Sequence, residues 1–175
     1  MKRKYYDYKL FRHEDGPGII YAKDVGLTPA GTEIYAMPVK NKTDEYDSVS
    51  KKTGIHFIFE DDIPMIPFYS VPYLCVFATD GGDGCFACRQ IPDISVEEPV
   101  YYIPGKKKIY RVAESLEELI SNGHKWQDNL RQTKRIKIYD SKAAAEKNEC
   151  FFEGCMIDNE AVPELSAQEI KELFQ

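Results

Sequence analysis

The order of apolar runs, glycine turns and helix-capping signals predicts a fold that combines strands with helices. An apolar run, residues 73–78, ends in a turn, residues 80–84, that holds three glycines and two aspartates. Two short apolar runs, residues 100–103 and 108–112, flank a Pro-Gly pair and therefore predict a hairpin. Ser115 then opens a capping box, a signal for the start of a helix. The other expected elements are placed around this central order of strand, glycine turn, hairpin and capped helix.

The glycine turn predicts a sharp reversal of the backbone. Glycine tolerates a positive φ, and aspartate closes turns by hydrogen bonds to nearby backbone groups. We expect Gly82 to adopt a positive φ, so that a larger residue at this position would destabilise the fold. Residues 85–89, which follow the turn, predict a short strand.

Short strands broken by glycine and proline are expected before the glycine turn. Residues 55–59 alternate with a period of two, so their odd-numbered side chains share one face, and His56 shares the other with Ile58. The expected elements are strands at residues 5–11, 19–22, 33–39 and 55–59, and a helix at residues 44–51 that ends by Gly54.

Helices and strands are expected to alternate after the hairpin. Leu116, Leu119 and Ile120 lie at helical spacing and form one apolar face of the helix that Ser115 begins. The expected elements are helices at residues 115–122, 124–131, 141–147 and 166–174, and strands at residues 135–139 and 150–157.

Three prolines interrupt an apolar segment at residues 63–72. Proline excludes a long helix and removes hydrogen-bond donors from a β ladder, so we expect an extended segment. Such a segment either packs on the core or forms an exposed binding lip. We favour packing on the core, because isolated apolar patches are seldom left in water.

The length of 175 residues favours a single globular domain, residues 1–175. No apolar run approaches the roughly 20 residues that a membrane helix needs. The first residues are basic, but no apolar signal core follows them. Five cysteines, an odd number, are therefore expected to be reduced thiols. Together these observations predict a cytoplasmic protein.

Charge is unevenly distributed along the chain, whose formal net charge is −6. Residues 55–100 carry eight acidic and one basic side chains, whereas residues 101–147 carry six acidic and eleven basic ones. An acidic segment suits a basic partner and argues against nucleic acid. The alternative is that these carboxylates are ordinary solvated loop residues, and the charge pattern alone favours that alternative.

No constellation of catalytic, cofactor-binding or metal-binding residues is predicted. Cys85 and Cys88 form a C-x-x-C motif, but residues three apart in a strand point to opposite faces and cannot chelate one metal ion. The motif also lacks the helix N-terminus that lowers the pKa of a redox cysteine. Asp80 and Asp83 have the residue type for a cation site, yet aspartates beside glycines are explained by the turn itself. The three histidines lie in separate elements.

Four segments resemble the SUKH superfamily, which includes the Smi–Knr-like fungal cell-wall regulators and many bacterial immunity proteins. They are residues 57–59, residues 67–69, the run VFATDGGDG at 76–84 and the run VAESLEELI at 112–120. The resemblance covers about residues 55–121 and leaves residues 148–175 as a C-terminal extension with a terminal helix. Many members begin with an amphipathic helix, from which this strand-like N-terminus departs.

The resemblance implies an α+β fold with a curved, mainly antiparallel sheet and helices packed against it. It also implies a non-catalytic, cytoplasmic immunity protein that binds and blocks a cognate toxin domain. Such a toxin is often a basic nuclease, which an acidic surface would attract. Acidic residues near the glycine turn, with aromatic anchors beside them, are the partner-binding candidates: Glu60, Asp61, Asp62, Phe68, Tyr69, Tyr73, Asp80 and Asp83.

The sequence is also compatible with two other functions. The fungal relatives suggest a regulatory scaffold that binds several host proteins and no toxin. A third function is small-molecule binding or catalysis around Asp80, Asp83 and Tyr102, which would require a deep pocket between those side chains.

Overall fold

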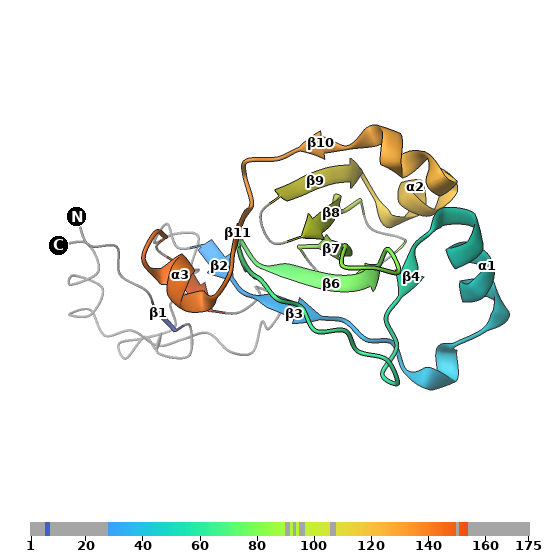
Figure 1. The fold of residues 1–175 in the computed structure, drawn as a ribbon, viewed down its shortest axis with the longest axis horizontal. Coiled ribbons are helices and arrows are strands. Elements are labelled where there is room, and N and C mark those ends of the chain that lie inside the picture. The colour runs from blue at the N-terminus through green and yellow to red at the C-terminus, as the bar shows by residue number, and fades with distance from the viewer. Residues whose placement is uncertain are drawn as a thin grey trace, which may run out of the picture.

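The computed structural model describes residues 6–7, 28–89, 92, 94, 97–105, 108–149 and 151–153, and the following account concerns these residues (Figure 1). Among them, no helix is both long enough and apolar enough to cross a membrane. Mixed helices and a mostly antiparallel, open sheet make up the fold, so the α+β prediction is confirmed.

The central sheet has seven strands, ordered β10-β9-β8-β7-β6-β3, with β4 paired to the end of β6 beyond β3. All its pairs are antiparallel except β3 with β6. The strands are β3 (Thr32–Ile34), β4 (His56–Phe57), β6 (Leu74–Thr79), β7 (Cys85–Cys88), β8 (Val100–Gly105), β9 (Lys108–Ala113) and β10 (Arg131–Gln132). The predicted hairpin is β8 and β9, and the predicted strands on either side of the glycine turn are β6 and β7.

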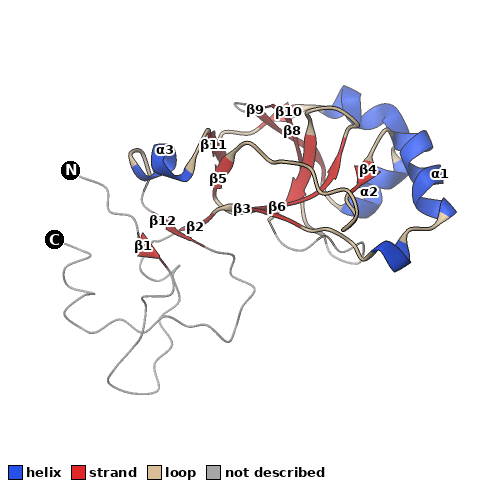
Figure 2. Ribbon diagram, turned by 60° about the horizontal axis from the view of Figure 1, so that its bottom comes forward, coloured by secondary structure: helices blue, strands red, loops and turns tan. Residues whose placement is uncertain are grey.

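Both faces of this sheet are covered. β6 and β7 are buried almost throughout, as expected for central strands with side chains packed on each side. One face packs with α1 (Asp44–Thr53), α2 (Leu116–Ser121) and the 3₁₀ helix η4 (Gly123–Asn129) around Phe77, Phe86 and Leu119. Figures 1 and 2 show α1 and α2 at one end of the sheet and α3 (Lys142–Glu146) beyond the other.

Trp126 of η4 contacts both the end of α1 and the central sheet. Its indole packs edge-to-face on Phe86, with ring centroids 4.9 Å apart. The indole Nε1–H donates a 2.8 Å hydrogen bond to the carbonyl of Thr53, the last residue of α1. A side chain that is 3% exposed therefore connects η4, α1 and β7.

The opposite face is covered by chain segments rather than by α-helices. Its core holds Ile58, Leu74, Ile103 and Ile136. β5 (Tyr69–Val71) pairs with β11 (Lys137–Tyr139) in a separate two-stranded sheet.

A third, parallel sheet joins segments from opposite halves of the chain. Its order is β1-β12-β2, formed by β1 (Tyr6–Asp7), β12 (Phe151–Glu153) and β2 (Thr28–Ala30). Phe151 is fully buried with Ala30 and Val71, so the start of the predicted extension belongs to the packed structure. The predicted strand at residues 19–22 and helix at residues 166–174 lie outside the described residues.

Local capping signals placed the helices well. The side chain of Ser115 accepts a hydrogen bond from the backbone N–H of Glu118, and that of Ser141 accepts one from the N–H of Ala144. The predicted helix at residues 44–51 is α1, and Gly54, at φ +70°, follows its end. The predicted helix at residues 124–131 is instead the 3₁₀ helix η4.

The predicted strands at residues 33–39 and 55–59 are longer than the observed ones. β4 covers only two residues, and Ile58 is buried, although alternation placed it on the face of the exposed His56. The reason lies in contacts with distant parts of the chain. The backbone N–H of Ile58 donates a hydrogen bond to the carbonyl of Phe77 in β6, whereas the next residue, Phe59, forms a parallel bridge with Met37. The alternation therefore breaks within the segment.

The contact between Trp126 and Thr53 predicts a measurable loss on mutation. Trp126→Phe should lower the free energy of unfolding by about 1–3 kcal/mol, because it leaves the Thr53 carbonyl without this donor and leaves a gap beside Phe86. Urea denaturation measures the change. Leu130→Ala, at a neighbouring residue that is 42% exposed, serves as the control and should change it by less than about 0.5 kcal/mol. Equal losses in both variants would contradict the assigned role of Trp126.

Candidate functional site

The glycine turn is closed by Asp80. Its Oδ1 accepts hydrogen bonds from the backbone N–H groups of Gly82, at 2.8 Å, and Gly84, at 3.1 Å. Its Oδ2 accepts a 2.7 Å hydrogen bond from the Tyr102 hydroxyl of β8. The carboxylate is directed into the turn and holds it against the hairpin, so the turn-forming interpretation accounts for Asp80.

These hydrogen bonds set the protonation states of the pair. Burial raises the pKa of Asp80, but hydrogen bonds from Tyr102, Gly82 and Gly84 outweigh it, so the pKa of this carboxyl is lowered. Burial and the hydrogen bond to Asp80 together raise the pKa of Tyr102 well above its ordinary value. Asp80 is charged and Tyr102 protonated at neutral pH, and both pKa shifts extend the pH range over which this charge-assisted hydrogen bond persists.

Glycine is required in the turn at positions other than the predicted one. Gly81 has a φ of +81°, whereas Gly82 does not have a positive φ, so the expectation for Gly82 is wrong. Gly84 is required for space. A Cβ there would lie 2.4 Å from Oδ2 of Asp80 and 2.7 Å from the Tyr102 hydroxyl oxygen. The hydrogen-bonded approach of Tyr102 to the turn causes this requirement.

Exposed carboxylates lie in two turns, the turn that follows β4 and the glycine turn that follows its pairing partner β6. Glu60, Asp61 and Asp62 are exposed in the turn after β4, and Asp83 is exposed in the glycine turn. His56 at the start of β4 pairs with the last residue of β6, immediately before Asp80. Glu60 is four positions after His56 in the chain, so the two lie at most roughly 13 Å apart. We call these four exposed carboxylates the acidic margin.

One carboxylate of the acidic margin has a basic neighbour. Asp61 accepts a 3.1 Å hydrogen bond from Lys42 Nζ, with both side chains nearly half exposed. The same ammonium lies 5.3 Å from the ring centroid of Phe59. Exposed ion pairs of this kind contribute little to stability, so Asp61 is replaceable without unfolding the chain.

The predicted aromatic anchors are not on the surface beside the acidic turn. Phe68 and Tyr73 are 8% and 4% exposed, and Tyr69 is half-buried with its ring against Phe151. The Tyr73 hydroxyl donates to Glu33 at 2.8 Å. Tyr73 precedes β6 and Asp80 follows it, roughly 20 Å apart along a strand. Phe68 and Tyr73 are therefore buried and Tyr69 is half-buried, so none of the three is an exposed anchor beside the acidic turn in this structure, and their part in partner binding stays a prediction.

Two exposed apolar side chains lie in the proline segment, next to the acidic margin. Ile63 is 55% exposed and Met65 90% exposed, whereas Ile66 is half-buried and Phe68 buried. One side of this extended segment therefore packs on the core, and the other side is exposed as a binding lip would be. Ile63 follows Asp62 directly, which places the exposed apolar pair beside the acidic margin.

The cysteines described by the structure are buried in the sheet. Cys85 and Cys88 pack in different core clusters, on opposite faces as predicted. Burial, with a smaller effect of Asp80 and Asp83, raises the pKa of Cys85 to about 11, and burial raises that of Cys88 further. Such thiols carry little thiolate at neutral pH. Within the described ranges, no group of three His, Cys, Asp or Glu side chains could hold a metal ion.

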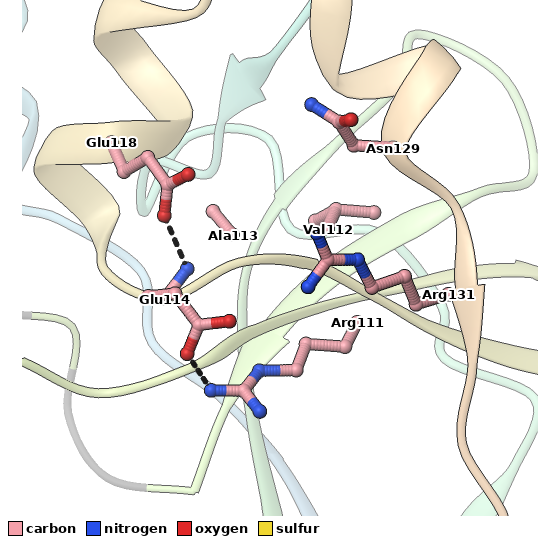
Figure 3. Close-up of a pocket in the computed structure, with 7 residues that line it drawn as sticks. All are labelled: Arg111, Val112, Ala113, Glu114, Glu118, Asn129 and Arg131. Carbon is pink, nitrogen blue, oxygen red and sulfur yellow. Dashed lines mark hydrogen bonds and ion pairs between the residues drawn. The ribbon is translucent and has the colours of Figure 1, made fainter.

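A small pocket lies at the edge of the sheet formed by β9 and β10 (Figure 3). Its volume is about 120 Å³. Arg111 forms an ion pair with Glu114, and the Glu118 carboxylate accepts a 2.6 Å hydrogen bond from the backbone N–H of Glu114. The lining residues are Arg111, Val112, Ala113, Glu114, Glu118, Asn129 and Arg131. The sequence does not predict this pocket, because the pairing of β10 with β9 has no local signal.

Comparisons with known proteins add no relative. No protein-family model matches the chain, and searches of curated proteins and of solved structures likewise found no match.

The geometry at Gly84 predicts a contrast between two glycines of one turn. Gly84→Ala should lower the free energy of unfolding by about 2–3 kcal/mol, because the new methyl group displaces Asp80 or Tyr102. Gly82→Ala should cost less than about 1 kcal/mol, since its backbone is not left-handed. Chemical denaturation of both variants tests this, and a larger loss for Gly82→Ala would refute the assignment.

The hydrogen bond between Tyr102 and Asp80 predicts a pH-dependent effect of Tyr102→Phe. A lowered folded-state pKa means that charged Asp80 contributes stability above the ordinary carboxyl pKa, and that this contribution is lost as pH falls through the folded value. The variant should therefore be less stable than the wild type at neutral pH, and the gap should narrow in acid. Thermal unfolding between pH 7 and about pH 3 measures it. A gap that stays constant over this range would contradict the coupling.

Proposed function

We propose that this chain is a non-catalytic immunity protein that binds a cognate toxin domain and blocks it by occlusion. The observation that carries the proposal is the acidic margin, whose carboxylates at Glu60, Asp61, Asp62 and Asp83 are exposed to a partner. The resemblance of residues 55–121 to the SUKH superfamily supports the same function. The proposed partner is a basic protein domain, such as a nuclease, in the cytoplasm.

Electrostatics supports a basic partner. Residues 55–100 hold eight acidic side chains and one basic one, and Lys42 from outside this segment pairs with Asp61 of the acidic margin. Complementary charge speeds association and selects among partners, and its effect declines with salt. Asp80 differs from the other acidic candidates, because its carboxylate is engaged in closing the turn.

Affinity requires apolar contact in addition to charge. Ile63 and Met65 are the candidate apolar anchors for the partner, in place of the aromatic residues, since both are exposed and closely follow the acidic turn. Pro64 and Pro67 restrict the backbone of this extended segment, which lowers the entropy cost of binding. A methionine side chain adapts to irregular apolar surfaces.

Two features of the chain support a role without catalysis. Burial suppresses ionisation of the Cys85 and Cys88 thiols, which makes them poor nucleophiles. The small-molecule alternative required a deep pocket between Asp80, Asp83 and Tyr102, but Asp80 and Tyr102 contact each other directly. Occlusion of the toxin by binding needs no reactive group on this chain.

Charge reversal tests the proposal with a matched control. The partner is the toxin domain encoded next to the chain, co-expressed to assay neutralisation and purified to measure association. Replacing Asp61, Asp62 and Asp83 by Lys should slow association at low salt by tenfold or more. The control replaces Glu117, Asp128 and Asp140 by Lys, which changes the net charge equally at exposed positions elsewhere.

The outcomes separate the candidate functions. Neutralisation by the wild type, with slow association in the first variant and not in the control, supports the proposal. Equal association rates for both variants would refute the acidic margin as the binding surface. Failure of the wild type to bind or neutralise the adjacent toxin domain would refute the immunity function and favour the regulatory scaffold.

A further inference from the structure

A pair of arginines marks a second site, built from elements other than those of the acidic margin. Arg111 of β9 and Arg131 of β10 are directly opposite each other in the antiparallel register. Directly opposed residues project from the same face of a sheet, and like charges in this arrangement destabilise it. A compensating negative charge is therefore expected near both guanidinium groups.

The chain supplies such a charge for only one of the two arginines. Arg111 forms an ion pair with Glu114, three residues further along the chain. Arg131 makes no ion pair with any residue that the structure describes. The exposed Arg131 guanidinium is thus free of any direct ion pair within the described part of the chain, although the Glu118 carboxylate lines the same pocket.

Arg111 also has a donor that is enclosed and unused. Its Nε atom is buried from solvent and has no hydrogen-bond partner among the described residues. Leaving a buried donor of a charged group unsatisfied is costly, and such an atom in a native structure calls for an explanation. An acceptor within the pocket that Arg111 lines would provide one once the side chain turns its buried Nε toward the pocket.

The acidic side chains of the pocket are already engaged. Glu114 pairs with Arg111, and Glu118 accepts the backbone N–H of Glu114 at the start of α2. The donors that remain are the Arg131 guanidinium, the Asn129 amide and Nε of Arg111. Figure 3 shows the Arg131 side chain extending over Val112 toward the middle of the lining residues.

We propose that this pocket binds a carboxylate group. The planar guanidinium of Arg131 matches the two oxygens of a carboxylate, and the Asn129 amide adds a neutral donor. A volume of about 120 Å³ accommodates a group of a few heavy atoms. The lining holds two arginines and two glutamates, so Glu114 and Glu118 repel a singly charged carboxylate less than they repel a phosphate dianion.

Nuclear magnetic resonance of the ¹⁵N-labelled full chain tests the site at millimolar ligand. The probe is sodium acetate, with sodium chloride at equal ionic strength as the reference. The Nε–H resonances of Arg111 and Arg131 and the side-chain amide of Asn129 should shift saturably with acetate and not with chloride. Arg131→Gln should weaken acetate binding by tenfold or more, and Arg131→Lys should also weaken it, because lysine lacks the planar pair of donors.

The control is Arg135→Gln, which removes an exposed arginine that does not line the pocket. It should leave the acetate affinity unchanged. The site is refuted if acetate gives no saturable shift, if Arg135→Gln weakens binding as much as Arg131→Gln, or if inorganic phosphate at pH 7 binds more tightly than acetate.

Two further arms identify the source of the carboxylate. An acetylated dipeptide with a free C-terminal carboxylate is compared with its amidated form and with acetate. Tighter binding of the free-acid dipeptide than of acetate assigns the site to the carboxylate of a protein or peptide. Equal or weaker binding assigns it to a small carboxylic acid, and binding of the amidated form as tight as that of the free acid would refute the proposal.

Discussion

The hydrogen bond from Tyr102 to Asp80 joins the parts of the fold that carry the candidate sites. One end of this contact closes the glycine turn, and the other belongs to a ring that packs on Phe86 and on Trp126, with centroids 5.0 and 4.8 Å away. Trp126 in turn bonds to the end of α1. The position of the glycine turn, and of Asp83 within it, therefore depends on an aromatic stack in the core.

Elements defined by neighbouring residues could be predicted from the sequence. The hairpin of β8 and β9, the caps at Ser115 and Ser141 and the end of α1 at Gly54 all depend on contacts within a few residues. Pairings across the chain could not be predicted in this way. The parallel contact of β3 with β6 and the two-residue strand β10 have no periodic signal, because the partner strand decides where each begins and ends.

The candidate site was predicted in part, for a physical reason. Charged residues such as Asp61 and Asp62 are exposed wherever the chain turns, so their exposure could be inferred from composition. Aromatic residues bury more area than any others and are drawn into the core, which is why Phe68 and Tyr73 are unsuitable as surface anchors. The exposure of Ile63 and Met65 could not be predicted, because an extended segment buries only alternate side chains and the sequence does not show which ones.

The parallel sheet of β1, β12 and β2 has a consequence for how the chain folds during its synthesis. The ladder partner of β2 is β12, so the hydrogen bonds between Thr28–Ala30 and Phe151–Glu153 form only after β12 has been synthesised, whereas the Pro29 carbonyl accepts a bond from the earlier Tyr73. During synthesis, when the N-terminal part emerges first, β2 presents an unsatisfied strand edge until more than a hundred further residues have followed. Closure of so long a loop is slow. The interval is a time in which chaperones, or a strand from another molecule, compete for that edge.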